Sequence, residues 1–254
     1  MQNSESQSLS WKPLFIFGVI LSLGLIIAAW IISDTIRTVS STDTISVKGL
    51  AEKPVTADTA RWNLTFSSKG STPSNAYSAL DTDRETVLSF LKDQGFLETQ
   101  ISFGAKSSHQ VTKREYGNNG HFTETFSHYQ AMQSVTVNTD DVQQMMKAGQ
   151  NAFLLDEANI ESTISRPEYL LSNLEEIKMS LIAEATHNAY TRASKFAQSG
   201  NIKVGAMKSA RQGAFYILAP QGGTDDGDYG GAYDKTTINK IARVVVTINY
   251  GISY

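Results

Sequence analysis

Asp225, Asp226 and Asp228 form the densest group of potential metal ligands in this 254-residue sequence. A calcium-binding EF-hand loop places oxygen ligands at its positions 1, 3 and 5 and a glutamate at position 12. Counted from Asp226, position 5 is Gly230 and position 12 is Thr237, so the glutamate is missing. We therefore expect a solvated loop rich in glycine and aspartate, with weak cation association as the alternative.

Histidines are the second candidates for metal chemistry. His109, His121 and His128 lie on two segments that are expected to pair as a hairpin, whereas a zinc site needs about three converging ligands. His121 and His128 are seven residues apart, so on a regular strand they face opposite sides. We expect surface histidines, and an exposed ion pair between His187 and Glu184 within one helical turn.

The parts needed for nucleophilic catalysis and phosphate binding are missing. The sequence contains no cysteine, no G-x-S-x-G and neither of the glycine-rich phosphate motifs G-x-x-x-x-G-K and G-x-G-x-x-G. Asp58 and Lys53 could serve acid–base chemistry, but we expect Asp58 to fix a turn between two strands. We assign no catalytic, cofactor-binding or metal-binding residue, and we expect no cofactor.

The charge balance also excludes a class of partner. The net charge is −3 and no run of lysine or arginine occurs, so we expect no nucleic-acid binding. Without cysteine, the fold has no disulfide bonds.

The longest apolar stretch, Leu14–Ile32, contains neither charge nor proline. At about 1.5 Å per residue, a helix of this length spans a hydrocarbon core of about 30 Å. A cleaved signal peptide has a shorter apolar core and a small-x-small cleavage site, whereas here Ala28-Ala29 is followed by Trp30. The sequence therefore predicts a retained transmembrane anchor.

This anchor divides the chain into four regions. They are a cytoplasmic tail (1–13), the anchor (14–33), a polar tether (34–44) and a folded domain (45–254). Basic residues flank the anchor on both sides, so their count does not orient it. The short tail suits a signal anchor whose long C-terminal domain is exported.

Strands and helices are mixed along the folded domain. Alternating or β-rich patterns predict strands at 45–51, 60–66, 101–111, 122–138, 161–169 and 242–250, and either a strand pair or one long strand at 203–218. Helical patterns predict helices that begin at Thr72-Pro73, at Thr139–Asp141 and at Asn173, and that end near Gly95, Phe153 and Gly200. The buried helix faces would hold Ala76, Leu80, Val87, Leu88 and Leu91, and then Ile177, Leu181, Ala185, Ala189 and Phe196. We expect an α+β fold with mostly antiparallel sheet.

Six blocks along the domain resemble one known family. They are ISVKGLAEKPVTADTARWNLTFSSKG (45–70), FLKDQGF (90–96), YQAMQSVTVNTDDV (129–142), AEATHNAYTRASKFAQSG (183–200), RQGAFYI (211–217) and IARVVVTINY (241–250). In this order they are similar to the SIMPL-domain (DUF541) family of bacterial envelope proteins, in its membrane-anchored subgroup. The loop at 221–236 departs from the resemblance, because it is longer and richer in glycine and aspartate.

The resemblance implies an α+β fold with ββα units, an exported domain, a tendency to oligomerise and no established reaction. It places the protein in the bacterial inner membrane as a single-pass protein, with its domain in the periplasm or outside. The leading hypothesis is a non-enzymatic envelope protein with an assembly or stress-related role. The alternatives are a small-ligand-binding module with a cleft between two halves and a metal-dependent hydrolase.

Aromatic residues concentrate late in the chain. Tyr216, Tyr229, Tyr233, Tyr250 and Tyr254 could form an oligomer contact through the final strands, because aromatic side chains are enriched at interfaces. We expect a homo-oligomer or contacts with other envelope proteins.

Overall fold

The computed structural model describes residues 20–31, 33, 43–116, 122–220 and 232–253. Within these ranges, no helix is both long enough and apolar enough to cross a membrane. Residues 20–31 are helical and belong to the predicted anchor, of which residues 14–19 and 32 lie outside the described ranges. His121 and the aspartates of the 225–228 cluster lie outside them as well.

The chain forms two compact units. The smaller takes in residues up to Val47 together with Arg192–Ala210 and Ile248–Tyr254, and the larger takes in Lys48–Thr191 and Arg211–Thr247. Every candidate site discussed below lies in the larger unit.

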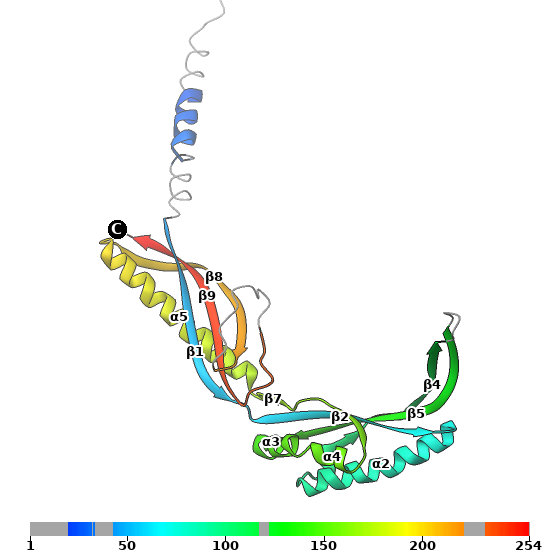
Figure 1. The fold of residues 1–254 in the computed structure, drawn as a ribbon. Coiled ribbons are helices and arrows are strands. Elements are labelled where there is room, and N and C mark those ends of the chain that lie inside the picture. Colours follow the sequence, from blue (N-terminus) through cyan, green and yellow to red (C-terminus); the bar gives the residue numbers. More distant parts are fainter. Residues whose placement is uncertain (1–19, 32, 34–42, 117–121, 221–231, 254) are drawn as a thin grey trace, which may run out of the picture. The chain divides into compact units, whose positions relative to one another are not determined.

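Three long strands form one sheet in the order β1-β9-β8, and helix α5 runs along it (Figure 1). The strands are β1 (Thr44–Thr56), β8 (Lys203–Leu218) and β9 (Asn239–Ser253), and the helix is α5 (Leu174–Ser199). The predicted alternation in β9 is confirmed: Ala242, Val244, Val246, Ile248 and Tyr250 are all buried.

Small residues form the buried stripe of α5. Ala185, Ala189, Ala193 and Ala197 follow one another every fourth residue and are buried, so they lie on one face of the helix. Phe196 was expected on this face and is instead exposed, which corrects the prediction. The alanines let α5 approach Gly49 of β1 closely.

Gly49→Ala is expected to destabilise the larger unit by about 1–3 kcal/mol, because overpacking forces the backbone apart. A Cβ at position 49 would lie 2.0 Å from Ala185 O and 2.8 Å from Ala189 Cβ. Gly200→Ala is the matched control, since the nearest atom to its added Cβ lies 3.6 Å away. Urea unfolding measures both, and equal unfolding midpoints would contradict the close helix–sheet contact.

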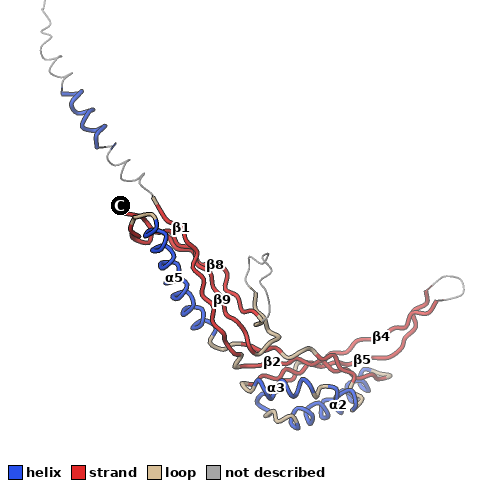
Figure 2. Tube along the Cα trace, turned by 60° about the vertical axis from the view of Figure 1, so that its left-hand side comes forward, coloured by secondary structure: helices blue, strands red, loops and turns tan. Residues whose placement is uncertain are grey.

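The second sheet has six strands, which pair antiparallel. The strands are β2 (Thr59–Gly70), β3 (Ile101–Phe103), β4 (Ser107–Tyr116), β5 (Phe122–Thr139), β6 (Glu161–Ile164) and β7 (Glu168–Leu170). Their main order is β3-β5-β2-β6, with β4 also paired to β5 and β7 to β2. Helices α2 (Pro73–Asp93), α3 (Val142–Gln150) and α4 (Phe153–Glu157) lie against one face of the sheet (Figures 1 and 2). This is the predicted α+β fold with mostly antiparallel sheet, and strand pairs alternate with helices.

Local signals in the sequence set much of this second sheet. Ala60, Trp62, Leu64 and Phe66 of β2 are buried, as their alternation predicts. Thr72 caps α2, because its Oγ1 accepts from Asn75 N–H at 3.2 Å. Gly95, after the end of α2, adopts a φ of 90°, which glycine tolerates best. On the buried face of α2, Phe90 takes the place that Leu88 was expected to fill.

The predicted strand at 101–111 is divided into β3 and β4. At the break, Gly104 N–H donates to Ser134 O at 2.8 Å, and Gln133 Nε2 donates to Gly104 O at 2.7 Å. These bonds satisfy the backbone of Gly104 outside a regular ladder, and both strands still pair with β5. The prediction of one strand was therefore wrong at this position.

The predicted strand at 161–169 is likewise divided, into β6 and β7. Pro167 has no N–H and cannot donate to a ladder. Ser165 donates to Asn63 O, from its N–H at 3.3 Å and from its Oγ at 2.5 Å. The predicted helix up to Phe153 is also interrupted, because α3 ends at Gln150 and α4 begins at Phe153.

Candidate functional site

The segment 232–239, which precedes β9, is joined by backbone hydrogen bonds to β8, β7 and the β1–β2 turn. These bonds run from Ile217 N–H to Ala232 O (2.8 Å), Asp234 N–H to Ile217 O (2.8 Å), Tyr169 N–H to Lys235 O (2.7 Å) and Ala57 N–H to Ile238 O (2.8 Å). The backbone of the segment is therefore held at several points.

Asp234 organises this segment through its carboxylate. Oδ1 accepts from Thr236 N–H at 2.8 Å and from Thr236 Oγ1 at 2.7 Å. Oδ2 accepts from Thr237 N–H at 3.3 Å and from the Thr237 hydroxyl. An aspartate that binds the backbone two and three residues further on is the ordinary means of fixing a tight turn. We call residues 234–237 the Asp234 turn.

Lys240 lies beneath the Asp234 turn. Its side chain is 0% exposed, and its Nζ lies 2.5 Å from Asp234 O and 3.5 Å from Asp234 Oδ2. A buried ammonium group is stable only when it is paired and hydrogen-bonded. Asp234 supplies both the countercharge and the backbone acceptor.

The pKa values of this pair reflect opposing causes. Burial by itself raises the pKa of Asp234, but the hydrogen bonds from Thr237 and Thr236 and the charge of Lys240 outweigh burial and lower that pKa to about 2. Burial lowers the pKa of Lys240, and the Asp234 charge opposes this shift. The two groups form an ion pair at 3.5 Å, in which each balances the charge of the other.

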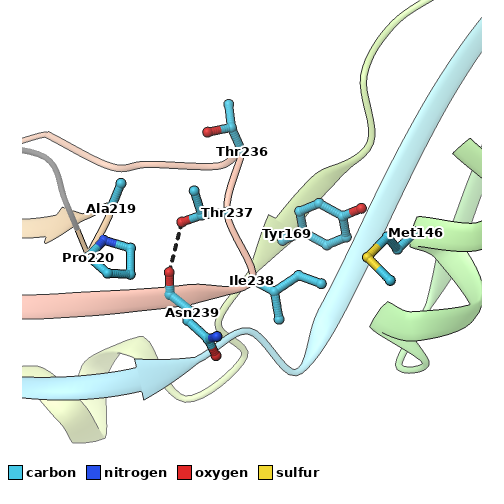
Figure 3. Close-up of a pocket in the computed structure, with 8 residues that line it drawn as sticks. All are labelled: Met146, Tyr169, Ala219, Pro220, Thr236, Thr237, Ile238 and Asn239. Carbon is cyan, nitrogen blue, oxygen red and sulfur yellow. Dashed lines mark hydrogen bonds between the residues drawn. The ribbon is translucent and has the colours of Figure 1, made fainter. Parts of the chain in front are cut away.

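A cavity of about 740 Å³ opens beside the Asp234 turn (Figure 3). Figure 3 shows Met146 and Tyr169 at one end and Ala219 and Pro220 at the other. Thr236, Thr237, Ile238 and Asn239 complete the lining. None of these described lining residues carries a charge, so the described part of the cavity is mainly apolar with a few polar groups.

Tyr169 is the most buried of the described residues that line this cavity. The residue is 7% exposed, and its hydroxyl has no hydrogen-bond partner among the residues that the structure describes. Burial raises the pKa of the Tyr169 phenol, so the hydroxyl stays protonated at neutral pH. It can therefore donate one hydrogen bond to a bound molecule.

A smaller hollow of about 340 Å³ lies along β2 and the end of β5. Its polar groups bond to one another: Arg61 Nε donates to Asn138 Oδ1 at 3.1 Å, and Gln100 Nε2 donates to Thr139 Oγ1 at 3.1 Å. These bonds give the groups a structural role, so the larger cavity is the better candidate site.

The histidines are not brought together. In the antiparallel register His109 pairs with Gln130 and His128 pairs with Val111, so the two are not opposite each other. In the described ranges no three His, Asp or Glu side chains lie close enough together to hold a metal ion. Glu184 and His187 are exposed on α5, and the described ion pairs do not include one between them, which corrects that expectation.

Asp58 has the turn-fixing role that the sequence suggested. Its carboxylate accepts from Ser172 N–H at 2.7 Å and from Ser172 Oγ at 2.6 Å. It thereby fixes the β1–β2 turn against the chain that precedes α5, and these bonds occupy its oxygens.

Two of the late tyrosines are internal. Tyr250 is buried, and Tyr233 accepts a hydrogen bond from Leu171 N–H through its hydroxyl at 2.9 Å. Tyr229 and Tyr254 lie outside the described ranges. Three exposed aromatic side chains lie on β4 and β5, where Tyr116, Phe122 and Phe126 are 77%, 59% and 50% exposed, whereas Phe153, Tyr190 and Phe196 are exposed on helices.

Sequence reasoning missed Asp234, Lys240 and Tyr169. One signal for Lys240 was present. It lies two residues before Ala242, so it falls on the same face of β9 as the buried residues of that strand. A lysine in a buried register requires a partner, and the D-x-T-T pattern at 234–237 is a turn signal just before it. For Tyr169 no such signal exists, because the cavity is made by distant segments.

The described part of the chain is an α+β domain with a mainly apolar cavity. Residues 45–247 match the family described as SIMPL: Protein of unknown function (DUF541). The chain belongs to this family. No curated protein matches the sequence.

Proposed function

We propose that this protein is a membrane-anchored envelope protein that acts by binding and self-association rather than by catalysis. The observation that carries this proposal is the exposed aromatic face of the ribbon formed by β4 and β5 (residues 107–116 and 122–130). Tyr116 pairs with Phe122 across the two strands, with ring centroids 4.4 Å apart. The ring centroids of Phe126 and Tyr129 are 5.3 Å apart, and the Tyr129 side chain packs against the hydrophobic core. The aromatic face of the ribbon is therefore in contact with the core through Tyr129.

Apolar residues 20–31 support the anchor. In this described part of the predicted segment the helix exposes large side chains, including Ile26 and Trp30. An exposed face of this kind is unfavourable in water and favourable in lipid. We infer an anchor over 14–33 with the domain exported into the bacterial periplasm.

A second copy of this chain is the occupant that suits the ribbon best. Lys113 and Arg114 are balanced by Glu115 and Glu124, with which they form ion pairs at 3.1 Å and 2.6 Å. The described ribbon therefore has no net charge, so two copies do not repel each other, and anionic lipid gains no electrostatic attraction. Within the described ranges β4 pairs only with β5, which leaves one edge of the ribbon unpaired.

The absence of cysteine allows a direct test in intact membranes. Thr112 lies opposite Phe126 on the aromatic face, whereas Thr125 lies opposite Lys113, one residue out of phase. Thr112→Cys is expected to cross-link to a second copy with a short bismaleimide, and Thr125→Cys to cross-link much less. Adding Phe122→Ser should lower the Thr112→Cys yield about tenfold, because burying a phenylalanine contributes about 1.5–3 kcal/mol.

The same variants report the orientation of the domain. A membrane-impermeant maleimide should label both cysteines from the periplasmic side in spheroplasts. Labelling only after lysis would overturn the exported orientation. Cross-links only to other proteins, or equal yields from the two cysteines, would overturn self-association through this face.

Binding of a small molecule is a second candidate function. The cavity beside the Asp234 turn favours it, because its volume falls within the range of about 300–1,000 Å³ that is usual for ligand sites. An uncharged lining and a hydroxyl without a hydrogen-bond partner, as found for Tyr169 among the described residues, are features of such sites.

A further inference from the structure

We infer that the cavity beside the Asp234 turn binds an uncharged, partly apolar small molecule that carries a hydrogen-bond acceptor. This inference rests on the second candidate function and names the chemical class of its ligand. The inference follows from the charges on the described lining, the apolar side chains that form most of its surface, and the two hydrogen-bond donors beside it.

The charges described around the cavity disfavour an ionic ligand. No lining residue in the described ranges is charged. Asp234 and Lys240 neutralise each other, and Lys235 pairs with Glu168 at 3.4 Å. An ion that leaves water for these apolar walls would meet no unpaired countercharge on the described lining, which is unfavourable.

Apolar side chains supply most of the contact surface. Met146 of α3 and Ile238 line the cavity together with the Tyr169 ring, and Ala219 and Pro220 lie at the other end (Figure 3). A thioether and an aromatic ring adapt well to a flat apolar group. The apolar part of the ligand is therefore expected against Met146 and Tyr169.

Two donors set the polar part of the ligand. Tyr169 is buried as a residue, and its hydroxyl is protonated and without a partner among the described residues. Asn239 accepts from Thr56 Oγ1 at 3.4 Å through its Oδ1, and no described residue accepts from its amide nitrogen. Both groups can donate, so the ligand needs an acceptor such as a carbonyl, amide or ether oxygen.

Three aromatic probes of similar size and different charge test this class: neutral benzamide, anionic benzoate and cationic benzylammonium. The full chain is placed in phosphatidylcholine nanodiscs, and binding is measured by saturation-transfer NMR with empty nanodiscs as the blank. We expect benzamide to bind at least about tenfold more tightly than either ion. Equal binding of all three probes, or binding of none, would overturn the inference.

Two variants locate the binding. Ala219→Trp fills the cavity and should abolish benzamide binding, whereas Ala210→Trp at an exposed position of β8 should leave it unchanged. Tyr169→Phe should weaken benzamide about three- to tenfold through loss of one hydrogen bond, without altering the circular dichroism spectrum. Binding that neither cavity variant changes would overturn the inference.

The ribbon proposal is assessed in the same membranes through the Thr112→Cys cross-link. If the cross-link forms while the probes fail to bind, only the ligand inference is lost. If the probes bind while the cross-link is absent, only self-association is lost.

Discussion

Asp234→Ala is expected to lower the free energy of unfolding by about 3–5 kcal/mol, the usual loss when one partner of a buried ion pair is removed. Lys240, which is fully buried, would keep its charge without a carboxylate nearby. The backbone and hydroxyl donors of Thr236 and Thr237 would lose their acceptor as well. Urea unfolding of the full chain, followed by circular dichroism, measures the loss.

Two comparisons separate the causes. Glu161→Ala removes an ion pair with Lys69 of 3.0 Å in which both side chains are about half exposed, so it should change stability by less than about 1 kcal/mol. Adding Lys240→Met to Asp234→Ala should recover part of the loss, because it removes the unpaired buried charge. If Asp234→Ala were no worse than Glu161→Ala, Asp234 would not be the group that stabilises Lys240.

The same pair predicts a dependence on pH. The pKa of Asp234 is about 2 in the folded protein against an ordinary value of 3.8. A lowered pKa contributes stability above the unfolded value, and this contribution is lost as pH falls through the folded value. The shift corresponds to about 2 kcal/mol. The difference between the wild type and Asp234→Asn should therefore shrink from pH 4 to pH 2, and a constant difference would contradict the lowered pKa.

Trp62→Ala is expected to cost about 3–5 kcal/mol, because it leaves a large void in the core of the second sheet. The Trp62 side chain is completely buried and packs edge-on against Phe90, with ring centroids 6.5 Å apart. Its Nε1 donates to Ser165 O at 2.8 Å, at the break between β6 and β7. Urea unfolding should show a large decrease in the midpoint.

Trp62→Phe is the matched variant that keeps most of the ring and removes the donor. It should cost about 1–3 kcal/mol, because Ser165 O loses its partner and the smaller ring leaves a small void. Equal losses for the two variants would show that the hydrogen bond, and not the packing, carries the effect of Trp62.

Much of the fold follows from local patterns in the sequence. The two-residue period of β2 and β9 places their apolar side chains on one face, and this period depends only on the strand backbone. Thr72 and Pro73 begin α2, and Gly95 follows its end, because these residue types satisfy or relieve the backbone locally. Family membership rests on the same patterned blocks.

The breaks and the burial of single residues could not be predicted in this way. Gly104 and Ser165 interrupt expected strands because partners distant in sequence, such as Ser134 and Asn63, satisfy their backbone or side-chain groups. Phe196 is exposed because alanines already fill the face of α5 that lies against the sheet. The spacing of apolar residues predicts which face of a strand or helix is buried, but it does not identify the element that packs against that face.

The aspartate cluster and the histidines drew attention because metal ligands are recognised by residue type alone. The candidate site instead combines Met146, Tyr169 and the Asp234 turn, which come from separate parts of the chain. By itself, the sequence determined the α+β class, the apolar N-terminal segment and the family, because these depend on periodicity, composition and ordered blocks. Only the tertiary structure decided that Lys240 is buried against Asp234 and that Tyr169 lines a cavity whose described residues carry no charge. Both depend on contacts between segments far apart in sequence, and burial, not residue type, determines what those groups can do.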